Sequence, residues 1–305
     1  MPILPEAVNR IVSELVQYIC PQKIISLTFP NTTSYCFMDS STYLSSRVIL
    51  LLKLICFALF SGRAWQHLFF STPMDTALSE GAMWLVSAMG VLYALLALVA
   101  LMITSRQRWL GYGLLLGSAL LFILSLFSFR NANYQLAQLL EHAGQFGSPV
   151  LLYLALFGKM NGTRFLFWVK VAIAVTFTCH GLFAAGVFYQ QPPHFIAMTM
   201  SILEVGEPVA RTFLQFAGLM DLVVSIGIFL PTTARYCLLY AMVWGFLTAL
   251  ARFAANVQWD ALGLSLHQWL YPVIYRLPHA GLPLVALFLG AYRPFPIRYR
   301  TKTAA

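Results

Sequence analysis

Long, unbroken runs of apolar residues are the feature that most constrains this chain. Eight such runs follow residue 45, and few of their positions carry a charge. A helix of about 20 apolar residues matches the hydrocarbon core of a bilayer. Strands of a membrane barrel would instead alternate apolar and polar residues over segments of about ten. The chain is therefore predicted to be an all-α integral membrane protein.

The predicted spans make up most of the chain. They cover residues 46–70, 82–104, 109–129, 145–159, 164–189, 212–230, 235–256 and 269–292. The fourth run is short for a full crossing, so we expect it to begin earlier or to lie partly in the interface. Only 10% of the residues are charged, against about 25% in soluble domains, which excludes a soluble globule, a disordered chain, a coiled coil and a collagen.

The segments on either side of the spans are predicted to be cytoplasmic. Within residues 1–45, positions 6–20 place apolar side chains along one helical stripe, and Pro21 ends the predicted helix. Such an amphipathic helix lies on a membrane surface or packs beneath a bundle. The last segment, 293–305, is a short basic tail.

Lysine and arginine are distributed unevenly among the connecting segments. With the N-terminus in the cytoplasm, the inner segments hold twelve of them and the outer segments hold four. The positive-inside rule then places both termini in the cytoplasm, at a plasma or inner membrane. The net charge of +9 follows from this distribution, and no basic-aromatic groove pattern indicates a nucleic-acid partner. No cysteine or histidine spacing fits a metal site.

The second half of the membrane region repeats features of the first half in the same order. Spans 1, 2 and 4 align with spans 5, 6 and 8. The matched residues are Arg47 with Arg164, Lys53 with Lys170, Arg63 with His180, Gly90 with Gly227, and His142-Ala143-Gly144 with His279-Ala280-Gly281. We therefore predict two tandem four-helix units, 46–160 and 161–292, in the same orientation.

Ionisable residues inside the spans gather at one depth, near the outer leaflet. A charge at the bilayer centre costs roughly 2.5–3.5 kcal/mol on insertion scales, so such residues tend to face a bundle interior and mark function. We predict a shared polar pocket with His180 and Asp221 as catalytic residues. The candidate ligand-binding residues are Arg63, His67, Glu141, His142, Arg252 and His279. Asp221 is expected to pair with His180, and Glu141 with Arg63.

Two lysines and one insertion complete the set of candidate features. Lys53 and Lys170 lie about six residues inside spans 1 and 5, where long side chains snorkel to the cytoplasmic interface, which predicts a structural role. The insertion at 190–211 has no counterpart in the first half. Within it, Phe195–Val205 is predicted to form a short interfacial helix. A lid over the outer pocket, a docking segment and a plain surface loop are all open interpretations.

The second half resembles the DoxX-like membrane proteins. The resemblance rests on His180-Gly181 within VKVAIAVTFTCHGLFAAG, and on Asp221 within GLMDLVVSIG. The first half departs from the pattern, because Arg63, Ala64 and Trp84 replace the histidine, the glycine and the acid. The resemblance covers 46–292 as a double copy. It implies one four-helix bundle per half, and a link to quinone-coupled sulfur or thiol oxidation, which is the role of the DoxD/DoxX subunits of thiosulfate:quinone oxidoreductase.

Three functions follow as alternatives. The first is a membrane subunit of a quinone-linked oxidoreductase, which holds no redox cofactor of its own, binds a quinone at the outer cluster and docks a soluble partner subunit. The second is a small-solute transporter, although transport sites usually lie at the bilayer midplane. The third is a non-catalytic scaffold or assembly protein. A b-type haem between His142 and His279 is disfavoured, because both histidines lie at the ends of their spans.

Overall fold

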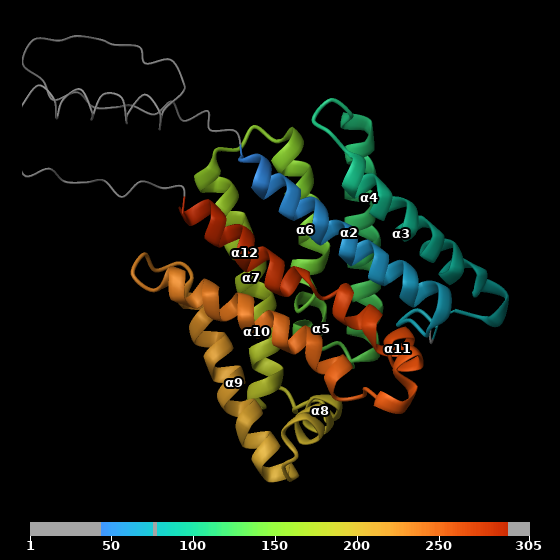
Figure 1. Cartoon of the computed structure of the whole chain (residues 1–305), viewed down its shortest axis with the longest axis vertical. Coiled ribbons are helices and arrows are strands. Elements are labelled where there is room, and N and C mark those ends of the chain that lie inside the picture. Colours follow the sequence, from blue (N-terminus) through green and yellow to red (C-terminus); the bar gives the residue numbers. More distant parts are fainter. Residues whose placement is uncertain (1–43, 76–77, 292–305) are drawn as a thin grey trace, which may run out of the picture. The chain divides into compact units, whose positions relative to one another are not determined.

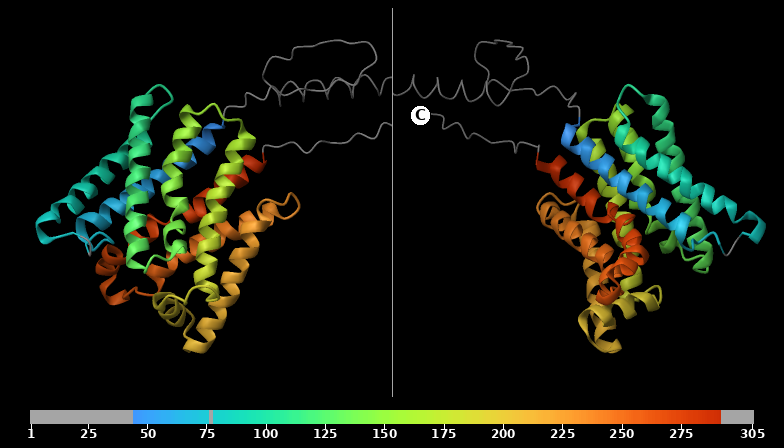
Figure 2. Two further views of the ribbon diagram at one scale, coloured as in Figure 1. Left: turned by 180° about the vertical axis from the view of Figure 1, so that it is seen from behind. Right: turned by 45° about the vertical axis from the view of Figure 1, so that its right-hand side comes forward.

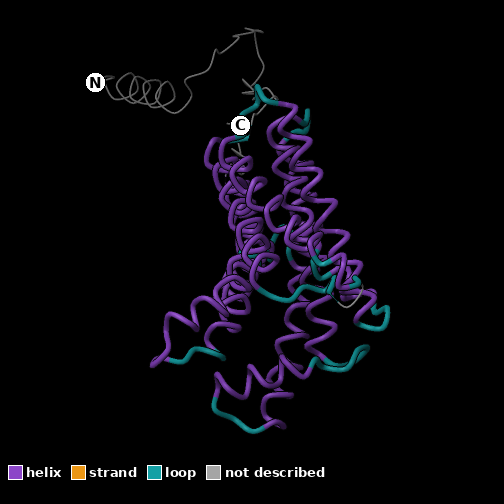
Figure 3. The backbone as a smooth tube through the Cα atoms, turned by 90° about the vertical axis from the view of Figure 1, so that its right-hand side faces the viewer, coloured by secondary structure: helices purple, strands orange, loops and turns teal. Residues whose placement is uncertain are grey.

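The computed structural model describes residues 44–75 and 78–291, and these residues form a helical bundle without strands (Figure 3). The predicted amphipathic helix at 6–20 and the basic tail at 293–305 lie outside the described residues. The α-helices of the described part are α2 (Ser46–Phe69), α3 (Trp84–Met102), α4 (Arg108–Asn131), α5 (Leu136–Leu140), α6 (Ala143–Phe157), α7 (Gly162–Ala185), α8 (Pro193–Leu203), α9 (Glu207–Gly227), α10 (Ala234–Ala254), α11 (Leu262–Ile274) and α12 (Pro278–Ala291).

The prediction of an all-helical integral membrane protein is confirmed. Six helices, α2, α3, α4, α7, α9 and α10, are long and apolar enough to cross a bilayer. Helices α11 and α12 together form a seventh candidate span, which is bent by 43° at a short break. Many of these helices expose large apolar side chains on their outer surfaces, as a lipid environment requires.

The expected fourth and eighth spans differ from simple crossings. Helix α6 has 15 residues, which is about 22 Å by helical rise and shorter than a bilayer core of about 30 Å. The short helix α5 precedes it, separated by Glu141 and His142. The eighth span begins earlier than expected, at α11, and is interrupted at 275–277, just after Pro272 and just before Pro278. Proline removes a backbone donor and crowds the preceding turn, which explains the interruption.

Four helices form the centre of the bundle. Helix α2 contacts α6 and α12, and α7 contacts the same two helices. Helices α3 and α4 cover one side of this centre, and α9 and α10 cover the other (Figures 1 and 2). The chain enters α2 and leaves α12 at the same end of the bundle (Figure 1). The interior is apolar, with fully buried side chains such as Leu52, Phe60, Phe165 and Ile173.

Small residues allow a close crossing between α7 and α9. A Cβ atom added at Gly218 of α9 would lie 2.6 Å from the carbonyl oxygen of Gly181 and would also strike the backbone of Ala185. Glycine at such positions lets two membrane helices approach at backbone distance. Asp221 lies one turn further along α9, so the crossing also fixes where this carboxyl group enters the bundle.

The insertion in the second half forms the predicted short helix. Helix α8 packs on α9 and contacts α10, and Phe195 and Ile196 are buried there. The amide of Gln191 holds the segment before α8, because its nitrogen donates to the carbonyl oxygens of Ala184 and Arg211 at 2.7 and 3.1 Å. Burial of the His194 ring lowers its pKa to about 4, so this histidine is neutral at pH 7.

We expect Gly218→Leu to lower the free energy of unfolding by about 3 kcal/mol or more, because backbone atoms of α7 cannot yield to the new side chain. The measurement is thermal unfolding of the purified protein in mild detergent. Gly263→Leu is the matched control, since a Cβ at Gly263 meets no atom within 4 Å. Equal melting temperatures for the two variants would contradict the close crossing.

Candidate functional site

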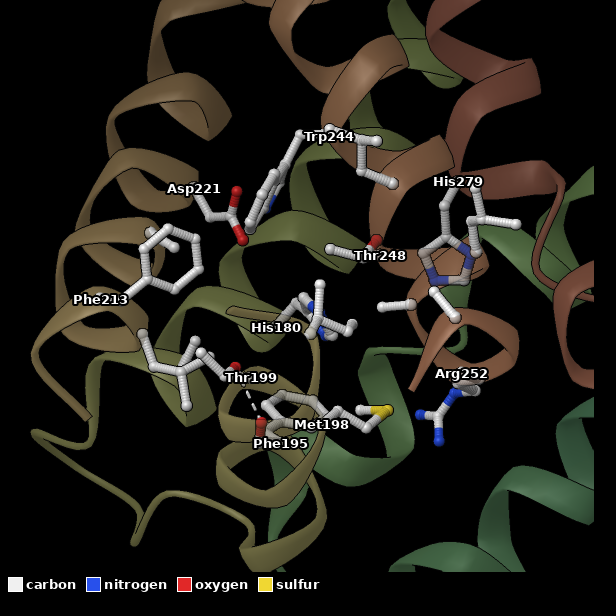
Figure 4. A pocket seen from close by; sticks show the side chains of 18 of the residues that line it. His180, Phe195, Met198, Thr199, Phe213, Asp221, Trp244, Thr248, Arg252 and His279 are labelled. Atoms are coloured by element: carbon white, nitrogen blue, oxygen red, sulfur yellow. Dashed lines mark hydrogen bonds between the residues drawn. The ribbon is translucent and has the colours of Figure 1, made fainter. Parts of the chain in front are cut away.

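A cavity of about 360 Å³ lies between α7, α8, α9, α10 and α12. Its wall is mainly apolar, with Phe195 and Met198 of α8 and Phe213 of α9 among the lining side chains (Figure 4). Four of the eight catalytic or ligand-binding residues expected from the sequence line it together, namely His180, Asp221, Arg252 and His279. Figure 4 shows His180 in the middle of the labelled side chains, between Asp221 and Arg252.

Asp221 is the most unusual group in the cavity. It is 1% exposed, and neither carboxylate oxygen has a hydrogen-bond partner within the described part of the chain. The indole N–H of Trp244 lies close enough to interact with the carboxyl group, beside which Figure 4 shows its ring, but the geometry falls short of a regular hydrogen bond. An unsatisfied buried polar group costs about 1–3 kcal/mol, and more if it is charged. The carboxyl group is therefore free to bind a donor that enters the cavity.

The expected hydrogen bond between Asp221 and His180 is not formed. Both side chains face the cavity, but the imidazole of His180 packs against the ring of Phe195, with ring centroids 5.0 Å apart. The two helices cross at Gly218, which brings their backbones together and leaves the two side chains to line the cavity wall from separate directions. The cavity thus holds an acid and a base that do not satisfy each other.

His279 has its tautomer fixed by the break between α11 and α12. Its Nδ1 lies 2.8 Å from the backbone oxygen of Arg276, which can only accept, so Nδ1 carries the proton. Its Nε2 then offers a lone pair. The same carbonyl oxygen also accepts the backbone N–H of His279 at 2.9 Å, so the start of α12 presents a histidine acceptor at the cavity.

Two arginines line the end of the cavity near His279. The Nε atom of Arg252 has no partner among the described residues. Arg276 donates to the carbonyl oxygen of Pro272 at 3.4 Å, and its guanidinium lies 4.5 Å from the ring centroid of Tyr275. No carboxylate forms an ion pair with either guanidinium within the described part. This end of the cavity therefore favours a carbonyl oxygen or an anion.

The other four predicted ligand-binding residues do not line this cavity. Arg63 donates to the amide oxygen of Gln66 at 2.8 Å and also to that of Gln145. Its guanidinium stacks on Tyr275, 3.9 Å from the ring centroid. The expected ion pair between Glu141 and Arg63 is therefore not formed. Two neutral amides and an aromatic ring bind the buried cation instead, and its Nε has no hydrogen-bond partner among the described residues.

Glu141 and His142 interact with their own neighbours. The Nε2 atom of His142 lies 3.8 Å from a carboxylate oxygen of Glu141, which also accepts a hydrogen bond from Gln138. His142 Nδ1 donates to the carbonyl oxygen of Gln138 at 3.0 Å. Glu141 lies at the junction of α5 and α6, so its side chain is engaged there while Gln145, one turn into α6, reaches Arg63.

His67 and the two lysines have local roles in the described structure. The Nδ1 atom of His67 donates to the carbonyl oxygen of Arg63 at 2.9 Å, and its ring lies edge-on to Tyr93. Lys53 donates to the carbonyl oxygen of Leu101 at 3.1 Å, which is the end of α3. A lysine that reaches a helix C-terminus is consistent with the predicted snorkelling. Lys170 is partly buried on α7.

Some residues that line the cavity, and some that bind Arg63, were not among the site residues predicted from the sequence. Trp244 and Arg276 line the cavity, and Gln66 and Gln145 bind Arg63. The two glutamines carried a usable signal, because an amide inside an apolar run is rare and needs a partner. Trp244 gave no such signal, since tryptophan is also common at membrane interfaces.

Among the described residues, no three histidine, cysteine, aspartate or glutamate side chains come together as metal ligands. Comparison of the chain with protein-family models, with curated proteins and with solved structures finds no match. The resemblance to DoxX-like proteins therefore stays a prediction.

We expect Gln145→Leu to lower the free energy of unfolding by about 1.5–3 kcal/mol, because it removes a hydrogen bond to a buried cation. The double variant Arg63→Met/Gln145→Leu should lose less than the sum of the two single variants, since the cation that needs the amide is gone. Chemical unfolding of the four proteins in detergent measures this. Strictly additive losses would contradict the contact.

Proposed function

We propose that the chain is a membrane subunit that binds a lipid-soluble quinone in the cavity lined by His180, Asp221 and His279. The carrying observation is the buried carboxyl group of Asp221, which forms no regular hydrogen bond within the described part of the chain and faces a mainly apolar cavity. A quinone is a flat apolar ring with polar oxygens, and it is dissolved in the bilayer. The cavity offers apolar walls for such a ring and polar groups for its oxygens.

The chemistry divides between this chain and a partner. Reduction of a quinone to a quinol takes up two electrons and two protons. We propose that a soluble partner subunit, which oxidises a sulfur compound or thiol, supplies the electrons. His180 and Asp221 then deliver the protons, and Arg252 draws a quinone oxygen toward the basic end of the cavity. The DoxX-like resemblance of the second half favours the same function.

We also propose that the chain is two tandem four-helix copies. Helix α2 contacts α3 as α7 contacts α9, and α4 contacts α6 as α10 contacts α12. Helix α2 packs on α11 as α7 packs on α5, so each copy completes the other. The chain enters α2 and leaves α12 at one end of the bundle, which favours an even number of crossings and both termini in the cytoplasm.

Burial supports a specific register for the repeat. In α2 and α7, the buried residues coincide when Arg63 is matched with His180. In α3 and α9, they coincide when Tyr93 is matched with Asp221, which pairs Gly90 with Gly218 and replaces the sequence match of Gly90 with Gly227. In α6 and α12, matching Pro149 with Pro283 pairs Gln145 with His279, and it replaces the sequence match of His142 with His279. The described contacts favour this register, because Gly147 faces Ala172 as Gly281 faces Ile55.

This register allows the two halves of the chain to be compared residue by residue. His180, Asp221 and His279 of the second half occupy the places of Arg63, Tyr93 and Gln145 in the first. In the first half the long side chain of Arg63 reaches Gln145. In the second half the shorter His180 leaves a cavity. We propose that the second half carries the ligand site and that the first half is its structural counterpart.

We expect His180→Ala and Asp221→Leu to lower the affinity for quinone about tenfold or more, since each removes a polar partner of a buried ligand. The measurement is mass spectrometry of quinone that co-purifies in mild detergent, followed by titration. His267→Ala is the control, because this histidine lies among Trp65, Phe69 and Phe70, outside the cavity. Wild-type protein that neither retains nor binds quinone would overturn the proposal and favour a transporter or a scaffold.

The internal comparison gives a second test. The triple variant His180→Arg/Asp221→Tyr/His279→Gln introduces the corresponding residues of the first half at the three positions of the second half. We expect it to fold and to lose quinone binding, because the guanidinium would fill the cavity and bond to the new glutamine. Melting temperature and quinone titration are measured together. A folded triple variant that binds quinone as well as the wild type would contradict the register.

A further inference from the structure

A second, open cavity lies beside the first. It is about 460 Å³ in volume and is formed by α2, α10 and α12. Its lining is entirely apolar, with Leu51 and Leu54 of α2, Phe246 of α10 and Leu284 of α12 as examples. We refer to it as the apolar groove.

The groove lies next to the quinone cavity, and the two share part of their lining. Leu247 lines both, and it is 48% exposed at the surface of α10. On α12, His279 lines the cavity and the next residue, Ala280, lines the groove. From there the groove follows α12 toward the end of the bundle at which α2 begins, since it includes Leu51 of α2 and Leu284 of α12. It therefore leads from the polar cavity along the bilayer interior.

We infer that the apolar groove holds the prenyl chain of the quinone whose ring lies in the cavity. This inference rests on the proposed function. A long apolar chain attached to a polar ring is the ligand that fits a polar-ended cavity continued by a purely apolar groove. The single residue shared by the two, Leu247, marks the point where the ring ends and the chain begins.

The repeat offers a matched way to close the groove. In the register proposed above, Ala280 of α12 corresponds to Phe146 of α6. The ring of Phe146 packs edge-on against Phe122, with centroids 5.4 Å apart. An aromatic side chain is thus accommodated at the corresponding position of the first half, and Ala280→Phe would place the same ring in the groove.

Photoaffinity labelling tests the inference. The probe is a menaquinone analogue with a diazirine at the far end of its prenyl chain, bound to the full chain in lipid nanodiscs. We expect the label on groove residues of α2 and α12, and we expect menadione, which has the same ring system without the chain, to compete. In Ala280→Phe the groove label should fall at least fivefold, while quenching of Trp244 fluorescence by menadione should be unchanged. Ala119→Phe, on the lipid-facing surface of α4, is the control.

The two proposals fail in different ways. Wild-type protein that binds menadione but carries the chain label outside the groove would overturn this inference and leave the quinone cavity in place. Wild-type protein that binds neither menadione nor the probe would overturn the proposed function itself. An Ala280→Phe protein that is folded and labelled in the groove like the wild type would also overturn the inference.

Discussion

The cost of leaving a polar group unsatisfied inside a bilayer is the constraint on which this structure depends. Lys53 meets it by reaching the carbonyl oxygen at the end of α3. Arg63 meets it in part, deep in the bundle, through two amide oxygens and the ring of Tyr275, while its Nε has no hydrogen-bond partner among the described residues. Asp221 is different, because its carboxyl group is as deeply buried and has no such partner among the described residues. Asp221 differs from the other residues with unpartnered buried atoms in that both oxygens of its carboxyl group lack a partner, and a ligand is one explanation of such a group.

Backbone features bring the members of the site together. The glycine crossing of α7 and α9 sets Asp221 close to the backbone of α7, one turn from Gly218. At the break between α11 and α12, the carbonyl oxygen of Arg276 accepts both the backbone N–H and the Nδ1 proton of His279, which fixes the tautomer of this histidine. Irregular backbone at membrane depth is stable only where protein or a cavity surrounds it. The same break therefore shapes the cavity wall and supplies a lone pair to it.

The sequence carried most of the fold and part of the site. Continuous apolar runs predict six of the long helices, and the depth of the charged residues along them predicts that His180, Asp221, Arg252 and His279 meet. The sequence did not predict which of the buried polar side chains interact with each other. Charge alone suggests Glu141 for Arg63, whereas neutral Gln145 is one helical turn better placed. Nor could it define the eighth span, because Pro272 and Pro278 permit either a kink or a break, and only packing against α2 and α10 decides between them.

The proposed internal repeat offers an explanation of how a site can arise in one half of the bundle. Two copies that fold alike need the same buried small residues and the same prolines, but they need only one ligand site. In the proposed register, Arg63 and His180 occupy corresponding positions. Arg63 binds Gln145 in the first half, whereas His180 lines a cavity in the second half. Helix α8 belongs to the second half, and it forms a wall of the cavity with Phe195 and Met198. The cavity, the buried carboxyl group of Asp221 and the added helix α8 lie together in the second half, which agrees with the proposal that this half carries the ligand site.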